Sequence, residues 1–296
     1  MKDYSVHSLP MGPDFSNGFD LARFENFTDE MIDKWFCSPH AHTYYEVVWF
    51  SEGGGVHTVD FVDYPIEDNT FFFLAPGQLH CFDGKPHKGM TIMFDADLFN
   101  DNGSTEEVLL KYSIFNAFYA SPCVVASEPT MRVVRNLTQA MEKEMGRPEC
   151  FGHRTFMQSL MRLMLITFQR EYDPASRPLL NQTNNVHVHF LHFRRLLERD
   201  YRKVHDVQGY ALEMGVSSKY LNKIVAQCTL RTPLQLINDR VMLEAKRLLR
   251  FSNKMVKEVA FELGFEDPSY FVKLFKRQTG MLPSEFREKV SMNGNW

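Results

Sequence analysis

The sequence contains little cysteine and no long apolar segment, and both absences restrict what the protein can be. The five cysteines among its 296 residues are odd in number and form no C-x-x-C pair. A disulfide framework or a cysteine-rich zinc site is therefore not expected. The most apolar stretch, residues 160–168, is interrupted by Arg162, and residues 1–4 lead into no apolar signal core. We therefore expect a cytoplasmic protein with no membrane-spanning segment.

The chain also lacks a large excess of charge, with a net charge of −4, but its charges are unevenly distributed. Residues 182–296 contain 19 lysines and arginines against 12 aspartates and glutamates, a net charge of +7, which leaves −11 for residues 1–181. A basic C-terminal part indicates a nucleic-acid-binding domain attached to a domain of another kind. Chance segregation of charge explains such a difference about equally well. The length allows two domains.

One pattern occurs twice between residues 207 and 287. The sequence YLNKIV at residues 220–225 recurs as YFVKLF at residues 270–275, and Thr229 and Pro233 recur as Thr279 and Pro283 at the same offset. Upstream, an alanine and a glycine four residues apart, at 211 and 215, recur at 260 and 264. Repetition of this kind marks a duplicated supersecondary unit.

Each copy predicts a helix-turn-helix. A short amphipathic segment ends at Gly215 or Gly264, where glycine suits a turn that needs a positive φ. Ser217 and Asp267 then stand where a side-chain oxygen caps the start of a second helix. The second helix of such a unit lies in the major groove of DNA.

Residues 233–251 connect the two copies and predict one long amphipathic helix. Its apolar stripe contains Ile237, Val241, Ala245, Leu248 and Leu249, and its charged residues Asp239, Arg240, Glu244, Lys246, Arg247 and Arg250 lie elsewhere on the helix. Two recognition helices that read adjacent major-groove faces must be about 34 Å apart. The connecting helix is expected to set this separation.

Residues 264–287, GFEDPSYFVKLFKRQTGMLPSEFR, closely resemble the signature of the AraC/XylS-type family of bacterial transcription regulators. The resemblance covers about the last third of the chain. The first copy departs from the family pattern at Val225, where a phenylalanine is usual, at Ala226, where a basic residue is common, and at Leu230, where a glycine is expected. The resemblance implies a DNA-binding regulator, more often an activator, that acts with RNA polymerase and commonly forms homodimers.

The family resemblance also assigns residues to DNA. It places base contacts at Lys219, Asn222, Lys223, Ser269 and Lys273. Lysine favours the guanine edge and asparagine the adenine edge in the major groove. The phosphate contacts are assigned to Ser218, Arg231, Lys276 and Arg277, which position the protein without reading sequence. A solvated surface charge is the alternative for each single lysine.

Residues 24–98 predict a sandwich or barrel of short strands. The strands are expected at residues 44–50, 55–61, 70–74 and 90–94, separated by glycine and proline turn signals. Inside this region lies a histidine motif, His40-x-His42-x3-Glu46-x6-Gly53, followed by Pro76-Gly77-x-x-His80. Alternate residues of a strand share a face, so His40, His42 and Glu46 are expected to point the same way.

This histidine motif resembles the metal-binding motif of the cupin family, with Ala75 and Gly84 as departures. Three imidazoles and a carboxylate suit a divalent metal. The favoured alternative is a pocket for a small molecule without metal, and no cofactor is expected. The candidate effector pocket consists of His40, His42, Tyr44, Glu46, Trp49, Phe71, Phe73 and His80, with Phe82 as a further wall. If a metal is bound, its ligands are expected to be His40, His42, Glu46 and His80.

Residues 128–172 predict two helices separated at Gly146. The second is apolar on most sides between residues 156 and 168, so more than one surface must cover it. A partner chain is one cover, as dimerisation helices of AraC-type regulators commonly occupy this position. Burial within the monomer is the alternative. Residues 173–185 contain two prolines and three asparagines and predict a linker.

The predicted fold class is therefore α+β with several domains. We expect a cupin-like sensing barrel at residues 1–127, a helical dimerisation segment at 128–172, a linker at 173–185 and a double helix-turn-helix DNA-binding domain at 186–296. The predicted function is sequence-specific transcription regulation, by activation, in response to a small-molecule effector, and not catalysis. Sugars are a common effector class in the family. The alternatives are a metal-binding cupin enzyme or metal sensor fused to a DNA-binding domain, and a regulator whose barrel only dimerises.

Overall fold

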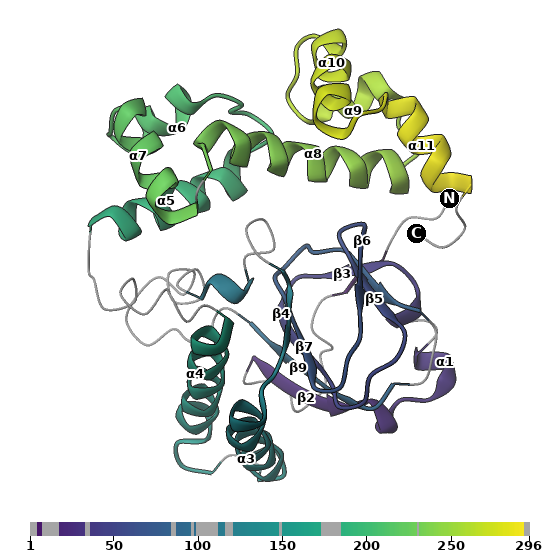
Figure 1. The fold of residues 1–296 in the computed structure, drawn as a ribbon, viewed down its shortest axis with the longest axis vertical. Helices are drawn as coiled ribbons and strands as arrows, with labels where there is room; N and C mark the ends of the chain where they lie inside the picture. The colour runs from purple at the N-terminus through teal and green to yellow at the C-terminus, as the bar shows by residue number, and fades with distance from the viewer. Residues whose placement is uncertain are drawn as a thin grey trace. The chain divides into compact units, whose positions relative to one another are not determined.

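The computed structural model describes residues 5–7, 18–32, 36–83, 87–95, 98, 112–115, 121–147, 150–172, 185–229 and 231–292. These residues fall into two compact domains, Tyr4–Asn181 and Gln182–Trp296. Figure 1 shows strands in the N-terminal domain and only helices in the C-terminal one. The predicted fold class is thus confirmed. Apart from Asn185, the predicted linker lies outside the described residues.

Two five-stranded sheets form the N-terminal domain. In spatial order the first consists of β1 (Ser5–His7), β3 (His40–His42), β8 (His80–Phe82), β5 (Val56–Val59) and β6 (Val62–Pro65). The second consists of β10 (Cys123–Val125), β7 (Thr70–Leu74), β4 (Tyr45–Phe50), β9 (Gly89–Phe94) and β2 (Phe19–Arg23). All pairs are antiparallel except β1 with β3. The predicted strand at residues 70–74 is reproduced without change, and the shorter elements between strands are η2 (Phe24–Asn26), α1 (Asp29–Ile32) and η5 (Ser113–Phe115).

An aromatic core lies between the two sheets. Phe50 and Phe72 of the second sheet meet Val59 and Phe82 of the first, and all four are buried. The Phe50 and Phe82 rings lie 5.1 Å apart in an edge-to-face arrangement, the geometry that aromatic pairs favour. Because strand side chains alternate, the residues of β4 that share this face with Phe50 include Glu46.

The other face of the second sheet is covered by α3 (Glu128–Met145) and α4 (His153–Tyr172), which lie beside the strands in Figure 1. Phe168 of α4 is fully buried and its ring lies 4.4 Å from that of Phe71. The two helices separate at Gly146, as predicted. This arrangement makes α4 part of the core of the N-terminal domain.

The C-terminal domain consists of seven helices within its described residues, and α8 is the longest of them. They are α5 (Asn185–Asp200), α6 (Val207–Glu213), α7 (Ser218–Thr229), α8 (Pro233–Phe251), α9 (Val256–Glu262), α10 (Pro268–Thr279) and α11 (Pro283–Met292). In Figure 1, α8 runs between the group α5 to α7 and the group α9 to α11. A reciprocal capping box between Thr232 and Gln235 fixes the start of α8.

The connecting helix α8 differs from the sequence expectation on its charged side. Ile237, Val241 and Ala245 are buried as predicted, but Arg240, Glu244 and Arg247 are also at most 9% exposed. The sequence pattern placed these three outside the apolar stripe, which normally means a solvated face. Arg240 and Glu244 are buried because α5 and the segment after it also pack against this side of α8. None of the described helices has the length and apolar character needed to cross a membrane.

Candidate DNA-binding surface and effector site

The two copies of the repeat fold in the same way. Gly215 and Gly264 have φ values of +66° and +81°, which confirms the predicted positive φ at both turns. The residue after each glycine donates its amide to the carbonyl of the repeated alanine, Ala211 at 2.9 Å and Ala260 at 3.0 Å. Both alanines are buried, so a larger side chain there would separate the two helices of the unit.

The recognition helices α7 and α10 begin at the predicted caps. The Ser217 hydroxyl accepts from the Tyr220 amide at 3.1 Å, and the Asp267 carboxylate accepts from the Ser269 amide at 2.8 Å. Pro268 follows as the first residue of α10. Each cap satisfies an amide that the first turn of a helix leaves without a helical partner.

Each recognition helix has one buried and one exposed face. The buried residues, all at most 5% exposed, are Leu221, Ile224 and Val225 of α7 and Phe271, Leu274 and Phe275 of α10. The predicted base-contacting residues lie on the exposed faces, and these are Lys219, Asn222, Lys223, Ser269 and Lys273. The burial of the apolar side confirms which face each helix turns to the core.

The predicted phosphate-contacting residues have different surroundings. Lys276 and Arg277 are exposed near the end of α10, whereas Ser218 is half-buried at the start of α7. Arg231 is half-buried and its guanidinium lies 2.6 Å from the Asp239 carboxylate. A phosphate at Arg231 would therefore compete with Asp239, a partner that the sequence pattern did not reveal.

In the N-terminal domain, β3, β4 and β8 bring the predicted histidines and glutamate together. His40 and His80 are directly paired in the ladder between β3 and β8, and their rings are 4.1 Å apart. The Glu46 Oε2 atom lies 3.1 Å from His42 Nε2 and 3.6 Å from His80 Nε2. One ligand atom each of His42, Glu46 and His80 lies within 4.8 Å of the others, and all three residues are buried. These three ligand atoms are close enough together for one metal ion to contact all of them.

Hydrogen bonds orient these imidazoles. The Nδ1 atom of His40 lies 2.9 Å from the Ser38 carbonyl oxygen, and that of His42 lies 2.7 Å from the Tyr44 carbonyl oxygen. A carbonyl only accepts, so Nδ1 carries a proton in both rings. His42 Nε2 then faces Glu46, with a lone pair if the ring is neutral and as a hydrogen-bond donor if the ring is protonated.

Two further residues support this cluster, and the sequence analysis did not identify either. His57 of β5 is fully buried, and its Nε2 atom lies 3.0 Å from His80 Nδ1. Thr91 of β9 donates its hydroxyl to Glu46 Oε1 at 2.5 Å. The alternation of β5 was the only signal in the sequence for His57, because it has no place in the histidine motif.

Burial sets the ionisation of this cluster. Burial opposes the charged form of Glu46, but hydrogen bonds and charge from His42, together with the Thr91 hydroxyl, lower its pKa overall. Burial also holds the pKa of His57 well below its usual value. A carboxylate and a neutral imidazole therefore lie in the same apolar interior.

The predicted aromatic walls are not all near the histidines. The opposite face of the second sheet, which packs against α4, contains Trp49, Phe71 and Phe73. Side chains alternate along a strand, so Trp49 points away from the face of Glu46 in β4, and Phe71 and Phe73 point away from the face of Phe72 in β7. Phe82 does reach the cluster, with its ring 4.7 Å from that of His57. Tyr44 stacks on His42 at 4.4 Å.

This combination of a polar cluster inside a β domain and a duplicated helix-turn-helix defines a DNA-binding regulator with a ligand-binding domain. Residues 28–165 match the family model described as the AraC-like ligand binding domain, and residues 210–289 match a helix-turn-helix domain model. The chain belongs to the AraC family of transcription regulators, and it is an effector-responsive DNA-binding regulator.

Several curated relatives match over most of the chain. The HTH-type transcriptional activator RhaS of Escherichia fergusonii is 23% identical over 251 residues, 84% of this chain and 87% of the relative. RhaS of Klebsiella pneumoniae is 24% identical over the same shares. Among solved structures, ToxT from Vibrio cholerae matches 91% of this chain and 94% of its own at 14% identity and a TM-score of 0.39. The DNA-binding domain of AdpA with a target DNA matches 38% of this chain and 97% of its own at 26% identity, with a TM-score of 0.33.

Proposed function

We propose that the protein is a sequence-specific transcription activator that reads DNA with both recognition helices. The observation that carries this is the repeated unit itself, in which α7 and α10 bury equivalent apolar residues and expose polar residues at two equivalent positions, Lys219 with Ser269 and Lys223 with Lys273. In this proposal Lys219, Asn222 and Lys223 contact bases from α7, and Ser269 and Lys273 contact bases from α10. Ser218, Arg231, Lys276 and Arg277 contact phosphates.

The relatives named as transcriptional activators support activation as the outcome. The protein then recruits or contacts RNA polymerase in the cytoplasm, and it catalyses no reaction. A small molecule in the N-terminal domain shifts a pre-existing equilibrium toward the DNA-competent state, by binding that state more tightly. In this proposal the sensing barrel is residues 1–127 of the N-terminal domain, followed in the same domain by the helical segment 128–172, and then by the linker 173–185 and the DNA-binding domain 186–296.

A homodimer through α4 is part of this proposal. Phe156 and Leu163 are seven residues apart, so they lie on the same face of α4, and they are 48% and 51% exposed. The opposite face of α4 is buried against the sheet through residues such as Met161 and Phe168. Large apolar side chains in pairs on an exposed helical face support a partner chain as their cover. The test is sedimentation of the full chain beside the double variant Phe156→Lys/Leu163→Lys, which is expected to be monomeric.

The DNA-binding proposal is tested by selecting fragments of genomic DNA with the purified full chain and with residues 182–296. We expect both proteins to enrich pairs of half-sites about one DNA turn apart. Enrichment of a single half-site by both would contradict the use of two recognition helices. Binding by the fragment alone would mean that the effector must be present, and the enriched DNA then becomes the assay for effectors.

A second candidate function, metal sensing, is favoured by the cluster of His42, Glu46 and His80. Because the Tyr44 carbonyl fixes the proton on Nδ1 of His42, two lone-pair atoms face each other 3.1 Å apart at His42 Nε2 and Glu46 Oε2. This pair needs a positive charge, supplied either by a second proton on His42 or by a metal ion. Hydrogen bonding of the outer ring nitrogen is the support that metal-binding histidines usually receive.

In this second candidate, His40, His42, Glu46 and His80 hold a divalent transition metal, the class that mixed imidazole and carboxylate ligands select. The test is elemental analysis of the purified full chain, after incubation with excess zinc, manganese or nickel and gel filtration. We expect one ion per chain, lost in His42→Asn/Glu46→Gln. The matched control is His153→Asn/Glu144→Gln, which removes a histidine–glutamate pair of the same 3.1 Å length in the same domain. Less than 0.1 ion per chain with every metal would refute the site.

A further inference from the structure

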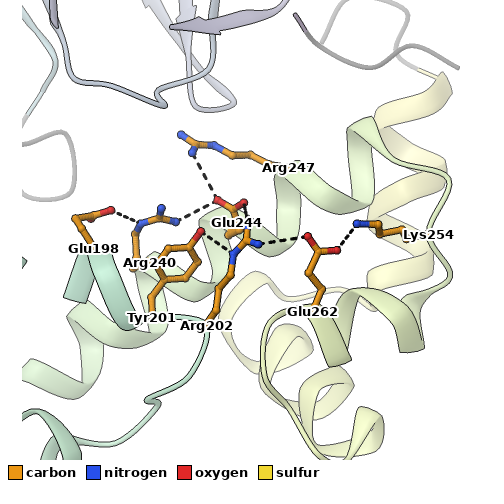
Figure 2. A network of polar contacts seen from close by, with 8 residues as sticks. All are labelled: Glu198, Tyr201, Arg202, Arg240, Glu244, Arg247, Lys254 and Glu262. Atoms are coloured by element: carbon orange, nitrogen blue, oxygen red, sulfur yellow. Dashed lines mark hydrogen bonds and ion pairs between the residues drawn. The ribbon is translucent and has the colours of Figure 1, made fainter. Parts of the chain in front are cut away.

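A network of charged residues centred on Glu244 connects α5 and the segment after it, which lead into the first helix-turn-helix unit, to the second unit. Glu244 lies on α8 with its side chain 10% exposed. Its carboxylate accepts from Arg202 at 2.9 Å and from Arg240 at 3.2 Å, and Arg247 lies 3.7 Å away. We call this set, together with Glu198, Tyr201, Lys254 and Glu262, the Glu244 network (Figure 2).

The members of the Glu244 network come from α5 and the segment after it, which lead into the first unit, from α8, and from α9 and the residues before it. On the side of the first unit, Glu198 of α5 accepts from Arg240 at 2.8 Å, and the Arg240 guanidinium lies 3.7 Å above the Tyr201 ring. On the side of the second unit, Glu262 at the end of α9 interacts with Arg202 at 3.5 Å and with Lys254. Arg202 therefore reaches from the segment after α5 to both α8 and α9, as Figure 2 shows.

The segment at residues 201–206 also touches the second unit through its backbone. A Cβ atom at Gly264 would lie only 1.9 Å from the Arg202 carbonyl oxygen, so the turn of the second unit packs directly on this segment. Next to it, the His205 ring stacks on that of Phe265 at 4.4 Å. These contacts give the second unit an attachment to the first that is independent of α8.

Such a second attachment changes what the second unit can do. The covalent connection from α8 to α9 is four residues, 252–255, and Arg287 of α11 additionally donates to the Leu249 and Lys254 carbonyls. These contacts hold the second unit to one end of α8. A unit that is attached only to one end of α8 can still rotate about the axis of this helix. The additional contact with residues 201–206 closes a ring of α8, this segment and α9, and the ring restricts that rotation.

We propose that Arg202, Glu244 and Glu262 are positioning residues that fix the angle between the two recognition helices, and thereby the half-site spacing that the protein accepts. This inference rests on the proposed contact of both helices with DNA. Insertion of one base pair moves one half-site by about 3.4 Å and rotates it by roughly 34°. Two units held together by these contacts cannot follow this movement. Two units that lack the contacts can follow it at a lower cost in binding free energy.

The experiment selects duplexes from a randomised library with the full chain, and its readout is the distribution of distances between the two enriched half-sites. Wild type is expected to give one spacing. Glu262→Gln, which removes two ion pairs at a partly exposed position, should enrich the same two half-sites with at least two adjacent spacings. Glu244→Gln should broaden the distribution further. The control is Glu213→Gln, which removes an exposed ion pair between α6 and Arg199 of α5 and should retain one spacing.

The same single spacing for wild type and for folded Glu262→Gln and Glu244→Gln would overturn the positioning role. If wild type enriched one half-site only, the two-helix reading of DNA would fail instead, so the two failures are distinguishable. A purely structural role predicts weaker binding by the variants to all duplexes with an unchanged spacing, and that result also counts against the inference. Circular dichroism at 222 nm identifies any variant that fails to fold. If Glu244→Gln does not fold, the result for Glu262→Gln, the more exposed position, decides whether the positioning role holds.

Discussion

Replacement of Gly264 by alanine tests how closely the first unit is packed on the second. Gly264 has a φ of +81°, and an added Cβ would lie 1.9 Å from the Arg202 carbonyl oxygen and 3.0 Å from its carbon. Gly215 occupies the same position in the first copy, with a φ of +66° and nothing within 4 Å of an added Cβ. The two substitutions therefore share the backbone strain and differ in the overlap.

The magnitudes follow from these two contributions. Left-handed backbone costs a non-glycine residue about 1–2 kcal/mol, and this is the whole expected loss for Gly215→Ala. Gly264→Ala adds a steric overlap that must displace the Arg202 backbone carbonyl, and overpacking costs of about 1–3 kcal/mol set the scale of this addition. We therefore expect Gly264→Ala to lower the free energy of unfolding by about 2–5 kcal/mol.

Hydrogen exchange of the full chain, followed by mass spectrometry, can locate these losses. In Gly264→Ala, protection should fall in peptides from α9 and α10 and in residues 201–206. In Gly215→Ala, a smaller fall should be confined to α6 and α7. Urea unfolding followed by circular dichroism supplies the overall stabilities. Equal losses for the two variants would refute the close packing of Gly264 on Arg202.

Three further predictions concern binding, acid stability and the sensor core. Lys273→Ala should weaken binding by about 1–3 kcal/mol and relax preference at one base position, whereas Lys276→Ala should weaken binding to all duplexes alike and reduce the salt slope, both measured by titration at several salt concentrations. Burial opposes ionisation of Glu244, but its three arginine partners lower its pKa below 4.5. The stability that ionised Glu244 contributes is therefore present above pH 4.5 and is lost as the pH falls through the lowered pKa. In urea unfolding, Glu244→Gln should lose less stability than wild type over that pH range. Phe168→Ala should cost about 3–5 kcal/mol, measured in the same way, because the ring packs fully buried against Phe71.

The helices of the C-terminal domain could be predicted closely because their signals are local. The bounds of α8 agree with the predicted residues 233–251, and both predicted caps and both positive-φ glycines are present. Each of these features depends on a few neighbouring residues, so the sequence contains them. The burial of Arg240 and Glu244 was not predictable in this way, because it depends on contacts with residues 42 positions earlier in the chain.

In the N-terminal domain, the success of the predicted effector pocket depended on which face of its strand each residue occupies. The motif residues His42, Glu46 and His80 meet in the structure because the ladders place β3, β4 and β8 around one interior. Trp49 was expected with them, but it is three residues from Glu46 and therefore faces the other side of β4. Strand alternation alone would have separated Trp49 from the histidines, whereas the partnership of His57 with His80 required the tertiary structure.

Two described departures of the first repeat from the family pattern differ in their surroundings, because Val225 lies in the core and Ala226 is exposed. Val225, which stands where a phenylalanine is usual, is fully buried, so a smaller residue there reduces packing and not contact with DNA. The first unit is also supported by α5, where the Phe193 ring meets that of Tyr210 edge-on at 5.5 Å and His189 lies 3.2 Å from the Tyr220 hydroxyl. The exposed face of α7 retains its lysines and asparagine, whereas Ala226 is exposed at the position that Lys276 occupies in the second copy. We therefore expect α7 to keep its base contacts and to lack one phosphate contact that α10 makes.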